Sequence, residues 1–246
     1  MSNPLKMINS FGQSIWYDNL SRELIRSGAL KKLIEEDGIS GVTSNPTIFL
    51  NAISNEKIYD DDIHAQVDTG ATVAGVYEHL VLNDIREAAD LLLPVFEATD
   101  GVDGYVSLEV PPRLAYERGK TVAEARRLFA LIDRRNLMIK VPATSQGIDA
   151  IRELISAGIN VNATLIFSIQ QYQGVAKAYM DGLDKWIESG GNPKQVASVA
   201  SFFVSRVDSV VDERLREFAG PVGRGMCGES LIRFIGNCLR VTGGYL

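Results

Sequence analysis

The sequence predicts an α/β fold of the (β/α) TIM-barrel type. Six short runs of apolar and β-branched residues alternate with helical patterns along most of the 246 residues. Strands that alternate with helices pair in parallel through right-handed crossovers. A doubly wound open sheet would show the same alternation. The barrel is favoured because polar residues recur in or just after the C-terminal part of the strands, and in a barrel these ends meet at one mouth.

Glycine and proline mark the ends of the expected elements. Strands are expected at residues 14–18, 39–44, 105–110, 137–141, 159–167 and 196–204. Helices with apolar residues at three- and four-residue spacing are expected at residues 21–36, 71–96, 121–133, 147–157, 168–188 and 207–218. Gly38 and Gly158 end the helices before them. Pro46 and Pro142 follow the strands that they close.

Residues 47–100 show no clear strand. Within this stretch, residues 71–96 have the spacing of one or two amphipathic helices, and the acidic triplet 60–62 is expected to be a solvated turn. Thr121 and Glu124 have the spacing of a capping box, which places the start of the next helix at Thr121. At this length a single barrel domain can use the whole chain, residues 1–246.

Composition and charge exclude several classes of protein. Hydrophobic residues make up 46% and charged residues 23%, which is ordinary for a globular chain. No apolar run approaches the roughly 20 residues that span a bilayer, so we expect no membrane partner. The 25 basic and 31 acidic residues give a net charge of -6 without a basic run, so we expect no nucleic acid partner either.

Cysteine and histidine counts restrict the chemistry. Two cysteines and no apolar signal segment favour a reducing cytoplasm. The two histidines, His64 and His79, are too few for a histidine-based zinc site or a Ser-His-Asp triad. We therefore expect no metal, and an enzyme of this composition would depend on Lys, Asp, Glu, Ser, Thr or Asn.

Lys140 is the most informative residue, because it lies inside the apolar strand 137–141. Burying an ammonium group is costly, so such a lysine is driven toward its neutral form. A neutral amine in a dry site is the nucleophile that forms a Schiff base with a ketone. A side chain that reaches solvent at the strand end, or a structural ion pair, would explain the same position.

Asp18 and Glu109 are acids at two other strand ends. Cleaving a carbon–carbon bond beside an iminium requires a proton to move on and off a hydroxyl, and a carboxylate can move it directly or through one water. Asp18 could instead cap the helix that follows it. Glu109 could instead pair with Arg113.

Polar residues at further strand ends fit a phosphorylated polyol. Asn162 and Thr164 share one face of a strand, and with Asn45 they could hold several hydroxyls. Capping of the strand edges by short polar side chains would explain them as well. Ser201 and Arg206 offer a hydroxyl and a guanidinium that suit phosphate oxygens, although a surface ion pair would equally occupy Arg206.

Three segments of the sequence resemble motifs of a known family, and they occur in the same order along the chain. They are GVTSNPT at residues 41–47, LMIKVPAT at residues 137–144 followed by Gly147 and Ile148, and GINVNATLIFS at residues 158–168. They resemble the second strand, the Schiff-base lysine segment and the fifth strand of the transaldolase family, over about residues 16–211. The resemblance implies a (β/α)8 barrel that transfers a three-carbon dihydroxyacetone unit between sugar phosphates, without a metal or organic cofactor, as in the pentose phosphate pathway.

The resemblance also implies catalytic roles. Lys140 matches the imine-forming lysine, and Asp18 matches the acid/base residue at the first strand. Glu109 and Thr164 match the pair that holds the catalytic water.

Five more residues match positions that bind substrate in this family. Asn45, Asn162 and Ser201 resemble residues that bind the hydroxyls of dihydroxyacetone, and Arg206 resembles a phosphate-binding arginine. Phe203 stands where the fructose-6-phosphate aldolase branch has a tyrosine. A phenyl ring has no proton to give, which favours the transferase branch.

The C-terminal segment departs from the family. Six strands are clear by Val204, but residues 220–246 contain no stretch that resembles a seventh or eighth strand. An open barrel exposes two unpaired strand edges. We therefore expect residues 220–246 not to supply both missing strands, and the chain either to associate with a second copy or to be only marginally stable.

Two other functions stay open on the sequence. One is a class I aldolase of the fructose-6-phosphate type, which releases free dihydroxyacetone. The other is a truncated, non-catalytic paralogue that acts as a binding or assembly partner.

Overall fold

A curled parallel sheet organises the chain. The computed structural model describes residues 3–219. The strands are β1 (Ile15–Tyr17), β2 (Ile39–Thr43), β3 (Tyr105–Glu109), β4 (Leu137–Pro142), β5 (Val161–Ile166) and β6 (Ser198–Phe202). All neighbours pair in parallel and in sequence order. A doubly wound sheet would reverse this order, so the barrel-type prediction is confirmed for these strands.

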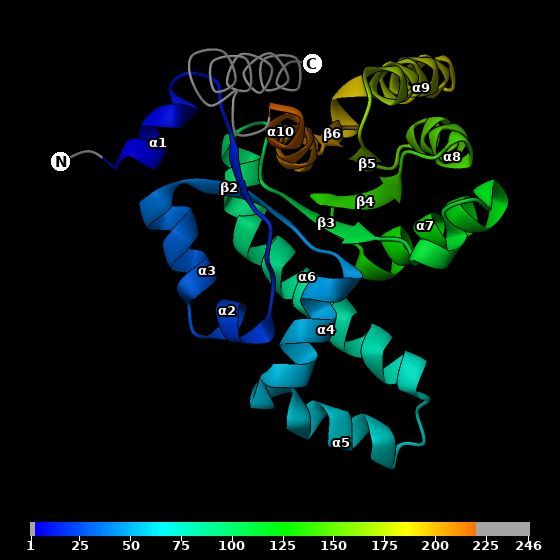
Figure 1. Ribbon diagram of the computed structural model, residues 1–246. Helices are drawn as coiled ribbons and strands as arrows, with labels where there is room; N and C mark the ends of the chain where they lie inside the picture. Colours follow the sequence, from blue (N-terminus) through cyan, green and yellow to red (C-terminus); the bar gives the residue numbers. More distant parts are fainter. Residues whose placement is uncertain (1–2, 220–246) are drawn as a thin grey trace.

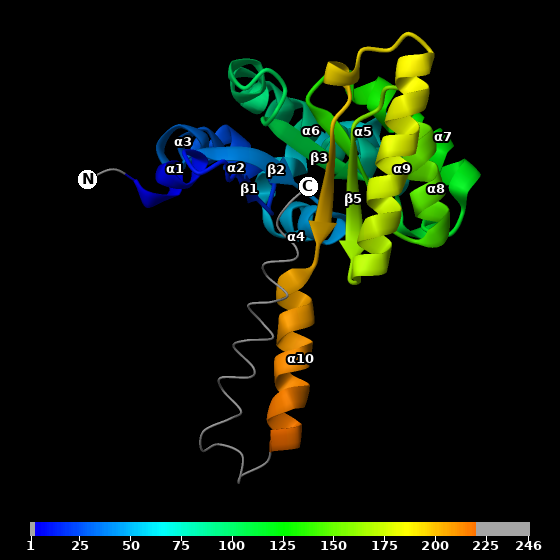
Figure 2. The ribbon, with the colours of Figure 1, turned by 90° about the horizontal axis from the view of Figure 1, so that it is seen from above.

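Ten helices precede, connect and follow the strands within residues 3–219. They are α1 (Pro4–Asn9), α2 (Arg22–Arg26), α3 (Ala29–Lys32), α4 (Pro46–Asn55), α5 (Asp60–Asp68), α6 (Val73–Ala98), α7 (Arg118–Ile132), α8 (Ser145–Ile155), α9 (Ile169–Glu188) and α10 (Val204–Ala219). Figure 1 shows α6, α7, α8 and α9 around the outer side of the curl. In Figure 2, α10 continues beyond the carboxyl end of β6, away from the sheet.

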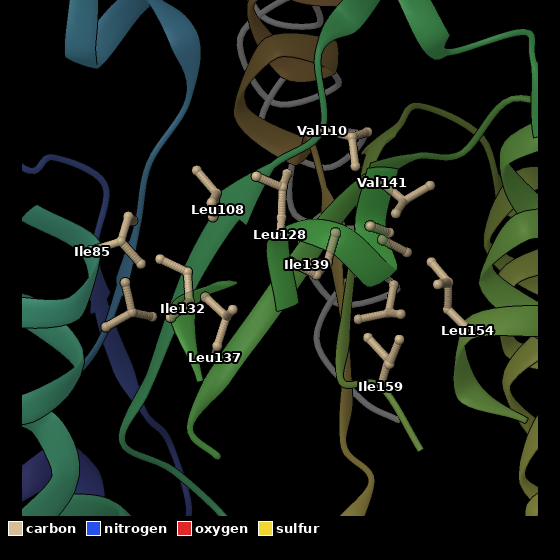
Figure 3. Packing of buried hydrophobic residues seen from close by; sticks show 14 of the residues in the cluster. Ile85, Leu108, Val110, Leu128, Ile132, Leu137, Ile139, Val141, Leu154 and Ile159 are labelled. Carbon is tan, nitrogen blue, oxygen red and sulfur yellow. The ribbon is translucent and has the colours of Figure 1, made fainter. Parts of the chain in front are cut away.

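The two faces of each central strand have different environments. One buried cluster contains Leu108 of β3, Val110 directly after it, and Ile139 and Val141 of β4, together with side chains of the surrounding helices (Figure 3). The helix residues packed there include Ile85, Leu128, Ile132 and Leu154. Because successive strand residues alternate between faces, the intervening positions lie on the inner side of the curl. Lys140 therefore faces inward.

Glycine changes the first helical segment from its expected form. The predicted continuous helix over residues 21–36 is wrong, since Gly28 adopts a φ of +80° between α2 and α3, a conformation that costs glycine little. A π-helical turn, Leu33–Asp37, follows, and Gly38 at a φ of +73° ends it as expected.

The start expected at Thr121 is also wrong. The seventh helix begins at Arg118, and Thr121 Oγ1 donates to the carbonyl of Leu114.

The acidic triplet 60–62 forms the first turn of α5, so the predicted solvated turn is wrong. Negative side chains at a helix N-terminus interact favourably with the helix dipole. Asp62 also has a partner that is distant in sequence, because its Oδ2 accepts a hydrogen bond of 3.1 Å from Arg22. This ion pair links α2 to α5.

Arg22 is the centre of a buried polar cluster. Its side chain is 1% exposed, and its Nε donates to Asp84 Oδ1 at 2.9 Å. Tyr59 Oη donates to Asp84 Oδ2 at 2.7 Å and accepts from the Arg22 backbone N–H at 2.8 Å. Burial raises the pKa of Asp84, while Tyr59 and Arg22 act in the opposite direction. The cluster joins α2 to α6 beneath the segment that follows β1.

Asp84→Asn should destabilise the fold, because a buried guanidinium would lose the charge that compensates it. Removing one partner of a buried pair costs about 3–5 kcal/mol, so we expect a loss of that order in the free energy of unfolding from urea titrations. Asp62→Asn is the matched control. Its carboxylate is more exposed, and a loss under about 1 kcal/mol is expected. Equal losses in the two variants would contradict this role for Asp84.

Three sequence expectations are not tested by the described structure: the one for residues 220–246, the one for association, and the one for the number of domains. The prediction for residues 220–246 lies outside the described residues. Association with a second copy and a single domain over residues 1–246 stay predictions, which light scattering and limited proteolysis would check. Among residues 3–219, no helix is long and apolar enough to cross a membrane.

Candidate active site

Lys140 lies at the centre of the candidate site. It projects from the inner side of β4 and is 6% exposed. Its Nζ donates to Thr43 Oγ1 at 3.1 Å and to the carbonyl of Ser44 at 3.3 Å, both at the carboxyl end of β2. Within the described residues it forms no ion pair. Neither a solvent-reaching side chain nor a structural ion pair therefore explains its position.

Glu109 is the carboxyl group beside this amine. Its position in β3 is paired with Lys140 in β4. Burial raises the pKa of Glu109, the cation of Lys140 lowers it, and the nearby carboxylate of Asp18 raises it further. No ion pair to Arg113 is present among residues 3–219. A half-buried carboxyl with a raised pKa next to a lysine is suited to proton transfer.

Asp18 lies on the exposed rim, just after β1. It does not cap the following helix, because Ser21 Oγ accepts the hydrogen bond from the Leu24 backbone N–H at 3.2 Å. The helix-cap interpretation of Asp18 is therefore wrong. Its carboxylate instead acts on Glu109 through the electric field of its charge.

Asn162 is held in a chain of side-chain hydrogen bonds. Its Nδ2 donates to Ser107 Oγ at 3.0 Å, and its Oδ1 accepts from Ser201 Oγ at 2.8 Å. Asn162 is almost fully buried and is paired in register with Lys140. Each hydroxyl can donate or accept, so both fit the side of the amide that they contact. The structure therefore brings Asn162 and Ser201 together on the inner face of the sheet.

Thr164 carries a buried hydroxyl with no hydrogen-bond partner within the described part of the chain. The residue is 1% exposed. The pairing of β5 with β6 shifts register between Ala163 and Ile166, and Leu165 adopts a left-handed φ of +60° there. Such a bulge changes the direction of the side chains around it. A buried hydroxyl without a partner is costly, so this one is suited to binding a water or ligand.

The remaining predicted residues lie at two places on the rim. Asn45 Oδ1 accepts from the Ile48 backbone N–H at 3.0 Å and so caps the N-terminus of α4, which is a helix cap and not the capping of a strand edge. On the other side, the ring of Phe203 lies 5.1 Å from that of Phe167. The guanidinium of Arg206 lies over Phe203 at 5.2 Å. Neither Phe203 nor Arg206 contacts Lys140 through a hydrogen bond or ion pair.

The sequence interpretation missed three polar residues of the site. Thr43 and Ser44 contact Lys140, and Ser107 contacts Asn162. All three lie in or directly after expected strands, and Ser107 is two residues before Glu109. Strand alternation could therefore have placed Ser107 on the same inner face. No local pattern indicates that Thr43 and Ser44 would accept hydrogen bonds from a lysine almost 100 residues away.

The fold and this inner face define a barrel-type α/β protein with a buried lysine at the carboxyl ends of its strands. A family model described as Transaldolase/Fructose-6-phosphate aldolase matches residues 15–237. The chain belongs to this family. Within residues 3–219 no group of three His, Cys, Asp or Glu side chains could hold a metal ion.

Curated relatives are similar over most of this chain. A transaldolase of Thiobacillus denitrificans is 55% identical over 213 residues, which cover 87% of this chain and 59% of the relative. Transaldolase 2 of Nostoc punctiforme is 51% identical over 208 residues, covering 85% and 55%. Transaldolase 2 of a Nostoc species is 51% identical over 213 residues, covering 87% and 56%. The matched part of this chain thus spans less than two thirds of each relative's length.

Proposed function

We propose that the chain transfers a dihydroxyacetone unit from a ketose phosphate to an aldose phosphate through a Schiff base on Lys140. Sedoheptulose 7-phosphate and fructose 6-phosphate are the proposed donors, and the interconversion is of the pentose phosphate type. The observation that carries the proposal is the buried Lys140 amine, held by two uncharged acceptors beside Glu109. The similarity to named transaldolases supports the choice of substrate class.

The reaction begins at the amine of Lys140. The neutral nitrogen attacks the C2 carbonyl of the donor, and the carbinolamine loses water to give an iminium. A base removes the proton of the C4 hydroxyl, the C3–C4 bond breaks, and its electrons pass to the iminium, which becomes an enamine. Asp18 is the proposed base, directly or through one water. The aldose phosphate is released, and the enamine carries the three-carbon unit.

The second half of the reaction runs in the opposite direction with an acceptor aldehyde. The enamine carbon attacks the aldehyde carbon, and the new alkoxide takes a proton. Water then adds to the iminium and the ketose leaves, returning the amine of Lys140. Glu109 and the free hydroxyl of Thr164 are proposed to hold this water, while Asn45, Asn162 and Ser201 bind the hydroxyls of the three-carbon unit.

Paired assays distinguish this reaction from its alternatives. With fructose 6-phosphate and erythrose 4-phosphate, transfer yields sedoheptulose 7-phosphate and glyceraldehyde 3-phosphate, and we expect product only when the acceptor is present. Release of free dihydroxyacetone without acceptor would support the aldolase alternative. Phe203 argues against that branch, because its ring supplies no proton. A folded chain that gives neither product would support the non-catalytic binding partner.

Arg206→Ala tests the proposed phosphate contact. The guanidinium lies on the first turn of α10 and is exposed beyond its contact with Phe203. Loss of one charge-assisted contact is worth roughly 1.5–3 kcal/mol, so we expect KM for fructose 6-phosphate to rise by about 10- to 100-fold. KM for unphosphorylated donors should change little. Arg216→Ala, on the same helix, is the control, and equal effects on the two donor types would argue against the role.

A further inference from the structure

Two fixed acceptors hold the amine of Lys140. One is the hydroxyl of Thr43 and the other is the carbonyl of Ser44. Ser44 is itself anchored to β3, because its backbone N–H and its hydroxyl both donate to the carbonyl of Ser107, at 3.3 and 2.8 Å. Ser44 is fully buried. The position of its carbonyl is therefore set by the sheet and not by the lysine.

The number of acceptors matches the number of N–H bonds in the reactive form of the amine. An ammonium group has three N–H donors. A neutral amine has two N–H bonds and one electron pair. The nitrogen is tetrahedral, and one of its four positions is the bond to Cε. When both N–H bonds point to Thr43 and Ser44, the electron pair must therefore occupy the fourth position. Without the Thr43 acceptor, the carbonyl of Ser44 could accept from either N–H bond, so the direction of the electron pair would no longer be fixed.

We propose that Thr43 is a positioning residue that, with the carbonyl of Ser44, directs the electron pair of the Lys140 amine toward the donor ketone. The inference rests on the proposed function, since it concerns formation of the Schiff base. The nitrogen pair forms the C–N bond as the carbonyl electrons move to oxygen. The proton that the nitrogen loses passes to the oxygen to give the carbinolamine, and a second proton, supplied by the surrounding water, joins the hydroxyl group as it leaves as water. One N–H remains on the iminium, so one of the two acceptors stays engaged.

A purely structural role for Thr43 would give different results from a positioning role. Valine has nearly the shape of threonine but no acceptor, whereas serine keeps the acceptor and loses the methyl group. Thr121 offers a control in a distant helix, because it carries a hydrogen-bonded hydroxyl that donates to the carbonyl of Leu114. Thr121→Val makes the same chemical change, from hydroxyl to methyl, without touching the candidate site.

The experiment measures borohydride trapping of the full chain with fructose 6-phosphate, by mass spectrometry over a series of donor concentrations. We expect Thr43→Val to slow trapping at saturating donor by about tenfold or more, with the half-saturating concentration changed by less than about twofold. Thr43→Ser should recover most of the rate. Thr121→Val should lower the thermal midpoint while trapping at the wild-type rate.

Three results would overturn the inference. Thr43→Val trapped at the wild-type rate would show that the hydroxyl does not orient the amine. Thr43→Ser as slow as Thr43→Val would show that the methyl group, and so packing, matters. Absence of trapping in the wild-type chain would overturn the proposed function itself and this inference with it. A failure of the inference alone would instead leave the wild-type chain trapped and appear only in the Thr43 variants.

Discussion

Lys140→Met is expected to abolish covalent trapping of the donor while the chain stays folded. Methionine is apolar and of similar length, so it fits the buried position on the inner side of β4. Without the amine no imine forms, and the covalent route is closed. We expect transfer activity to fall by a factor on the order of 10⁴ or more. This is the largest effect expected of any substitution in the chain.

The measurement is peptide mapping after borohydride reduction with fructose 6-phosphate. In the wild-type chain, a reduced three-carbon fragment should be found on the peptide that contains Lys140. Lys177→Met, at an exposed lysine of α9, is the control and should be labelled like the wild type. A fragment that persists in Lys140→Met at the wild-type level would show that another amine forms the adduct.

Strand alternation explains why much of this site could be predicted from the sequence. The strand patterns place Glu109, Lys140 and Asn162 in neighbouring parallel strands, and the pairing of these strands brings the three residues side by side. That prediction needed only local patterns and the rule that carboxyl ends of barrel strands meet. The sequential strand order is the order expected of a barrel in which each strand pairs with the next one along the chain.

Contacts between distant segments could not be predicted in this way. Nothing near Asp62 in the sequence indicates that Arg22 is buried against it, so the acidic triplet by itself predicts a solvated turn. The break at Gly28 comes with its left-handed φ of +80°, whereas apolar spacing alone continues through it. The acceptors of Lys140 lie at the carboxyl end of β2 and directly after it, far along the chain.

The pKa of Glu109 gives a pH dependence with a defined sign. Burial and the Asp18 carboxylate raise this pKa above its ordinary value, and Lys140 offsets part of the shift. A group whose folded pKa is raised stabilises the fold at pH below its unfolded pKa, and this contribution is lost as pH rises through the folded pKa. At neutral pH the ionised side chain is therefore unfavourable for stability. Glu109→Gln should leave the stability unchanged or slightly increased there.

Glu109→Gln should nonetheless remove most of the turnover. The ionised carboxylate is the proposed holder and activator of water for hydrolysis of the imine, and glutamine has no basic oxygen of this kind. Loss of general base catalysis is worth about 10²- to 10⁴-fold, so we expect kcat to fall by that factor. Imine formation by Lys140 should continue, and the borohydride-trapped fraction should stay at or above the wild-type level. Low turnover with high trapping would distinguish this variant from Lys140→Met, in which both are lost.

The acid limb of the pH–rate profile provides the second measurement for Glu109. Because the carboxylate must be ionised to activate water, its raised pKa should place this limb above the pH expected of an exposed glutamate. Asp18→Asn removes the negative charge that raises the pKa of Glu109, so the limb should move to lower pH, while Glu109→Gln should remove it. If Asp18 and Glu109 acted independently, Asp18→Asn would lower the rate without moving the limb. That outcome would show that the carboxylate on the rim does not set the protonation of the carboxyl beside Lys140.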